Sequence, residues 1–106
     1  MSNITDLEMT RLCAEAMGYR ILRERKASKQ LDYGDAILVK ELSSVYWPLH
    51  DDAQAMALVK KFHILIGTDS NHWTAFIPTV GRSIHSTDLN RAIVECVAKM
   101  RREKRK

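Results

Sequence analysis

The sequence predicts a small α+β domain, in which an antiparallel sheet of two to three strands packs with three amphipathic helices as a layered α/β/α sandwich. Three segments carry apolar residues at helical spacing, and the alternating segment 64–77 contains a turn in its middle. A chain of 106 residues, 45% of them hydrophobic, is large enough for one core and too short for two. We therefore expect one domain over residues 1–100 and a basic, solvated tail over 101–106.

The first predicted helix covers residues 6–17. Thr5, followed by Glu8 three residues later, forms a capping box at its start. Gly18 stands where a left-handed residue commonly ends a helix. The apolar stripe of this helix consists of Met9, Leu12, Cys13, Ala16 and Met17.

The segment between the first two helices has a weaker pattern. We expect a short extended piece at 19–22 and a charged, solvated loop at 23–31. The apolar run 36–39 fits a strand slightly better than a helical turn. Residues 43–48 should be extended or turn-like, because Trp47 precedes a proline.

A capped helix followed by a hairpin forms the centre of the predicted fold. Asp51 and Gln54 have the capping-box spacing, and they open a helix over 52–62 whose inward face includes Met56. The alternation that follows predicts two antiparallel strands around the turn 67–71. The second strand should carry Trp73, Ala75 and Ile77 on one face and end at Pro78 and Gly81.

The last predicted helix has the most regular apolar stripe in the chain. Ser86, Thr87 or Asp88 could cap its start, and the stripe ends at Met100. Only charge continues beyond Met100, so we expect the helix to fray there. The stripe consists of Leu89, Ala92, Ile93, Cys96, Val97 and Met100.

Charge is concentrated at the end of the sequence. Residues 99–106 carry a net charge of +5, against +4 for the whole chain, so the remaining residues are close to neutral. A second basic run covers residues 20–29. The two cysteines, Cys13 and Cys96, lie on apolar stripes and are expected to be reduced core residues, with a bridge between the two helices as the alternative.

Three blocks of the sequence resemble small bacteriophage-encoded proteins of the phage ABA-sandwich domain family. The blocks are TDLEMTRLCAEAMGY, YWPLHDDAQAMALVKKF and STDLNRAIVECVAKM, and they cover about half of the chain. Tyr19 stands where the family usually has tryptophan, and residues 23–44 have no counterpart. The resemblance implies a layered helix and sheet fold and a phage or prophage origin, without an established activity.

The sequence shows no pattern typical of a catalytic or metal site, so we expect no enzymatic activity, metal or cofactor. His63 and His72 flank the hairpin and could face each other, but a zinc site needs further ligands at matched spacing. His50, Asp51 and His85 are the only candidates for them. Neither cysteine has an electropositive, exposed setting, and no glycine-rich phosphate loop is present.

Two hypotheses for the function remain. The first is a phage accessory protein that binds and inhibits a host protein or protein–nucleic acid complex, for example a CRISPR effector in bacterial immunity. The second is a nucleic-acid or nucleotide-binding protein that uses basic and aromatic side chains. The candidate binding residues are Arg20, Arg23, Arg25, Lys26, Lys29, Trp47, Trp73, Arg101, Arg102, Lys104, Arg105 and Lys106.

The expected location is the cytoplasm of a bacterial host cell, because no segment predicts export or membrane insertion. A monomer and a small homo-oligomer both fit the sequence. An acidic surface that mimics DNA is a further open question, and its candidate residues are Asp32, Asp35, Glu41, Asp51 and Asp52.

Overall fold

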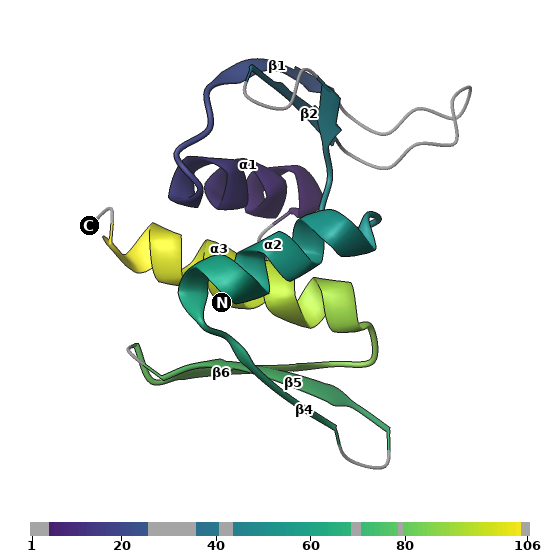
Figure 1. The fold of residues 1–106 in the computed structure, drawn as a ribbon, viewed down its shortest axis with the longest axis vertical. Coiled ribbons are helices and arrows are strands. Elements are labelled where there is room, and N and C mark those ends of the chain that lie inside the picture. Colours follow the sequence, from purple (N-terminus) through teal and green to yellow (C-terminus); the bar gives the residue numbers. More distant parts are fainter. Residues whose placement is uncertain (1–4, 26–35, 41–43, 69–70, 79, 105–106) are drawn as a thin grey trace.

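The computed structural model describes residues 5–25, 36–40, 44–68, 71–78 and 80–104, which form three helices and six strands (Figure 1). The helices are α1 (Asp6–Ala16), α2 (Asp52–Phe62) and α3 (Leu89–Lys104). The strands are β1 (Ile21–Arg25), β2 (Ala36–Val39), β3 (Ser44–Tyr46), β4 (Leu65–Thr68), β5 (Trp73–Ile77) and β6 (Arg82–Ser86).

The helices form a middle layer between two antiparallel sheets (Figure 1). One sheet has the order β1-β2-β3 and packs on α1, and the other has the order β4-β5-β6 and packs on α3. α3 also packs against α1 and α2. The α+β class with a small antiparallel sheet and three helices is confirmed. The order of the layers differs from the expected α/β/α order, because the segment between α1 and α2 contributes a second sheet and the helices lie between the two sheets.

α1 begins and ends almost where its sequence predicts. The Thr5 hydroxyl accepts a hydrogen bond from the Glu8 backbone N–H at 3.1 Å, which confirms the N-terminal cap. The helix ends at Ala16, one residue earlier than expected. Gly18 then turns the chain at a φ of 80°, a conformation that disfavours side chains with a Cβ.

The sheet over α1 includes residues that we expected in a loop. β1 extends to Arg25, and it pairs with β2 from Ile21↔Val39 to Arg25↔Ala36. The prediction of a loop from residue 23 is therefore wrong for 23–25, because backbone pairing on an edge strand tolerates charged side chains. The rest of that expected loop lies outside the described residues. The strand predicted at 36–39 is confirmed as β2.

The central helix and hairpin are confirmed, and a third strand follows them. The turn predicted at 67–71 is wrong for its first two residues, because Gly67 and Thr68 pair with β5 as the end of β4. The Asp51 carboxylate caps α2 by accepting from the Gln54 N–H at 3.1 Å. β4 pairs with β5 from Leu65↔Phe76 to Thr68↔Trp73. Beyond Ile77 the chain turns through Gly81 and returns as β6. We did not predict β6, because its sequence RSIHS contains one apolar residue.

α3 lies at the centre of the core. Its buried side chains, including Ile93, Val94 and Val97, contact α1 on one side and the β4-β5-β6 sheet on the other. The helix continues to Lys104, four residues beyond the predicted point of fraying. Arg101 is half-buried there, and its Nε lies 3.7 Å from the Glu15 carboxylate of α1, so residue 101 is part of the packed helix.

The described helices include none that is long and apolar enough to cross a membrane.

Candidate functional site

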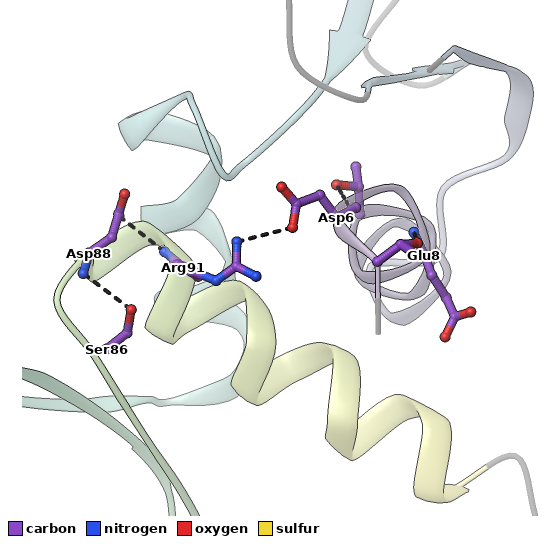
Figure 2. Close-up of polar contacts among 7 residues, drawn as sticks. Asp6, Glu8, Ser86, Asp88 and Arg91 are labelled. Atoms are coloured by element: carbon purple, nitrogen blue, oxygen red, sulfur yellow. Dashed lines mark hydrogen bonds and ion pairs between the residues drawn. The ribbon is translucent and has the colours of Figure 1, made fainter. Parts of the chain in front are cut away.

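The N-terminal ends of all three helices meet at one end of the molecule. The Arg91 guanidinium of α3 lies 3.0 Å from the Asp6 carboxylate of α1, as Figure 2 shows. The Asn90 amide of α3 donates to the Asp52 carboxylate of α2 at 2.7 Å. These two side-chain contacts fix the first turn of α3 against the first turns of both other helices.

Asp88 caps α3 at this meeting point. Its carboxylate accepts from the Arg91 N–H at 3.2 Å, and its own N–H donates to the Ser86 hydroxyl at 3.2 Å (Figure 2). An acidic cap is stabilising here, because the helix dipole places partial positive charge at the N-terminus. Of the three candidate caps, Asp88 therefore performs this role.

A groove with a volume of about 350 Å³ lies between the N-terminal halves of α2 and α3. Ala55 and Ile93 are buried in the core, whereas Met56 is 42% exposed. Asp52 and Asp88 are exposed. The groove is lined by Asp52, Ala55, Met56, Asp88, Leu89, Asn90 and Ile93.

The prediction that Met56 lies on the inward face of α2 is wrong. The buried residues of that helix are Ala55 and Leu58, and Met56 lies off their stripe. A long, flexible apolar side chain that is exposed beside a groove can adapt its shape to an incoming side chain. The departure of Met56 from the stripe was the available sequence signal for this site.

The lining of the groove combines apolar side chains with two carboxylates and one amide. Such a surface can hold an apolar group and attract positive charge beside it.

None of the histidines lines the groove. His63 precedes β4 and His72 precedes β5, so the antiparallel register puts them at opposite ends of the hairpin. The expectation that they could face each other is therefore wrong. His85 contacts the Thr74 hydroxyl on the sheet at 3.0 Å, and the His50 ring lies beside Trp47. Among the described residues, no three potential ligands form a group that could hold a metal.

Arg20, Arg101 and Arg102 lie at the other end of the helix layer. α1 and α3 run in the same direction, since Asp6 meets Arg91 at one end and Glu15 meets Arg101 at the other (Figure 1). Arg20 is exposed just beyond α1, and Arg102 is half-buried near the end of α3. The backbones of Arg23 and Arg25 lie in β1 and that of Lys104 in α3, whereas Lys26, Lys29, Arg105 and Lys106 lie outside the described residues.

The two tryptophans lie at the N-terminal end of the helix layer, away from Arg20, Arg101 and Arg102. The backbone N–H of Trp47 donates to the side-chain amide oxygen of Gln54, in the first turn of α2, at 2.7 Å. Trp73, 36% exposed, pairs with Ser86 immediately before α3. α3 rises about 16 Å from Asn90 to Arg101. Arg20, Arg101 and Arg102 therefore do not form one continuous surface with the two tryptophans.

Of the proposed acidic surface, Asp52 lines the groove and Asp51 caps the same helix, whereas Asp32, Asp35 and Glu41 lie outside the described residues.

The two cysteines are free and buried, and their thiols point to different elements. The Cys13 thiol donates to the Val94 carbonyl at 3.4 Å, and the Cys96 thiol donates to the Ala75 carbonyl at 3.7 Å. Burial raises the pKa of the Cys13 thiol, and the neighbouring Cys96 adds to this effect. The expectation of reduced core cysteines is confirmed, and a protonated, buried thiol such as Cys13 is a poor nucleophile.

The chain matches none of the protein-family models, curated proteins or solved structures with which we compared it.

Proposed function

We propose that this chain is a small, non-enzymatic binding module that inhibits a host protein by holding one of its segments in the groove between α2 and α3. The observation that carries the proposal is the combination of an exposed Met56, a buried apolar floor and two exposed carboxylates on the rim. Exposed apolar surface bordered by polar groups is typical of sites that bind other proteins.

A phage origin and a role in counter-defence, including inhibition of a CRISPR effector in the host cytoplasm, belong to the same proposal. They rest on the resemblance of the three sequence blocks, and the groove supplies a place at which such a target could bind. The target would be a host protein or a protein–nucleic acid complex.

Nucleic-acid or nucleotide binding is the second candidate function. The observation that favours it is the position of Arg20, Arg101 and Arg102 at the same end of the helix layer. The separation of both tryptophans from that end argues against a surface that combines stacking with phosphate contacts.

The test is a pull-down from bacterial lysate with nuclease-treated wild-type protein and two variants. Met56→Lys places a charge in the groove, and Val45→Lys is the matched control, because Val45 is 40% exposed and does not line it. We expect a host protein that is retained by the wild type and by Val45→Lys and is lost with Met56→Lys. Thermal melting establishes that both variants fold.

Retention of the same protein by Met56→Lys would contradict binding in the groove. The nucleic-acid alternative is tested on untreated protein, by the ultraviolet absorbance ratio after purification in low and in high salt. Co-purified nucleic acid that high salt removes, together with no specifically retained protein, would support the second candidate in place of the first.

A further inference from the structure

The two acidic side chains on the rim of the groove, Asp52 and Asp88, differ from Asp6 in the groups with which they pair. Asp6 forms an ion pair with Arg91. Asp52 accepts from the neutral amide of Asn90, and Asp88 accepts from a backbone N–H. Within the described part of the chain, no cation pairs with either of these two exposed carboxylates. Their negative charge is therefore available to a ligand in the groove.

The groove also presents an apolar surface beside these charges. Ile93 and Ala55 are buried below it, Leu89 is half-buried, and Met56 is exposed along one side. A ligand that is complementary to the groove has an apolar side chain that contacts the floor and a positive charge close to the two carboxylates on the rim. A nucleotide or nucleic-acid phosphate would instead meet repulsion from both carboxylates.

The basic tail of a second copy of this chain meets only half of this requirement. Residues 101–106 carry positive charge but contain no apolar residue. Met100, the last residue of the apolar stripe, is 4% exposed and already belongs to the core. The charge complementarity of the groove therefore favours a segment of a different protein.

We infer that the groove recognises a cationic, amphipathic segment of the partner, with an apolar side chain seated between α2 and α3 and Lys or Arg side chains beside Asp52 and Asp88. This inference rests on the proposed function and specifies the chemistry of its ligand. Amphipathic segments that lay one apolar face in a groove are a common mode of peptide recognition. The flanking charges add selectivity and accelerate association.

The test measures binding of short fluorescent peptides at low ionic strength. The probe combines Leu at helical spacing with Lys, a second peptide replaces each Lys by Glu, and a third replaces each Leu by Ser. The protein variant D52N/D88N removes both rim charges but keeps side-chain oxygens that accept the same hydrogen bonds. The matched control E8Q/E103Q removes two carboxylates that do not line the groove, so the net charge of the two variants is equal.

We expect only the Leu and Lys peptide to bind the wild type. D52N/D88N should weaken this binding by about 3- to 10-fold, since each exposed ion pair contributes modestly, whereas E8Q/E103Q should change it by less than about twofold. Equal effects of the two double variants, or no binding of the Leu and Lys peptide, would overturn the inference.

The proposed function can survive that result. If peptides with Leu bind equally whatever their charge, and Met56→Lys weakens them, the groove binds proteins and only its charge selectivity is refuted. If Met56→Lys changes neither peptide binding nor the pull-down from lysate, both the inference and the proposed function fail.

Discussion

At the residue scale, Cys13 is an ionisable group that folding keeps neutral. Its thiol lies in the core between α1 and α3, and burial raises its pKa above the ordinary thiol value of about 8.5. In the unfolded chain the same thiol loses its proton near that ordinary value. Ionisation therefore stabilises only the unfolded state.

We expect the stability of the protein to fall as pH rises. The neutral Cys13 thiol contributes to the free energy of unfolding, and this contribution is fully present below pH ~8.5. It decreases as pH rises toward the raised pKa of the folded state, by about 2 kcal/mol between pH 8 and 10. Urea denaturation at several pH values measures this slope. Cys13→Ala should be less stable than the wild type below pH ~8 and lose this part of the slope. Parallel curves for the two proteins would show that Cys13 ionises in the folded state.

At the element scale, Gln54 joins α2 to the sheet that covers α1. Its amide oxygen accepts from the Trp47 N–H at 2.7 Å, and its amide nitrogen donates to the Val45 carbonyl at 3.0 Å. The expected capping box is thus half-realised, because Asp51 caps the helix and the Gln54 side chain reaches the chain leaving β3 instead.

Replacing Gln54 by alanine should lower the free energy of unfolding by about 1–3 kcal/mol, since a part-buried N–H loses its acceptor. Gln54→Glu keeps an acceptor for the Trp47 N–H and loses only the bond to Val45, so it should lie between the wild type and Gln54→Ala. Chemical denaturation orders the three proteins. Identical midpoints for all three would mean that Gln54 does not join these elements in solution.

Local signals explain which elements the sequence predicts. Thr5 and Asp51 cap their helices through contacts three residues away, so these helix starts can be predicted from a short window. β1 and β6 are edge strands that depend on backbone pairing with β2 and β5, and their side chains carry little apolar alternation. The groove was not predictable in the same way, because Met56 and Asp88 come together only when α2 packs on α3.

At the scale of the whole molecule, three aspartates lie at the N-terminal end of the helix layer and two arginines lie at the other end. Asp6, Asp52 and Asp88 lie at helix N-termini, and Arg101 and Arg102 lie near the C-terminus of α3. Both sets complement the helix dipoles. We expected the segment 101–106 to be a solvated tail, but its first residues belong to α3 and Arg101 contacts Glu15.

Two truncations test whether Arg101 contributes to folding. Removing residues 104–106 should leave stability unchanged, whereas removing 101–106 should lower it by about 1 kcal/mol, because the partly exposed contact of Arg101 with Glu15 is also lost. Thermal melts of the full chain and both truncations measure this difference. Equal melts for the two truncations would mean that Arg101 contributes nothing to folding.

The order of the elements along the chain has a consequence for synthesis. α3, the helix on which α1, α2 and the β4-β5-β6 sheet all pack, follows every one of them in the sequence. A growing chain therefore exposes the apolar faces of these elements until residues 89–104 emerge, a condition that favours aggregation or chaperone binding. We expect a fragment of residues 1–88 to show no cooperative unfolding, and adding a synthetic peptide of residues 89–106 to restore it. Cooperative melting of the fragment alone would show that the earlier elements fold without α3.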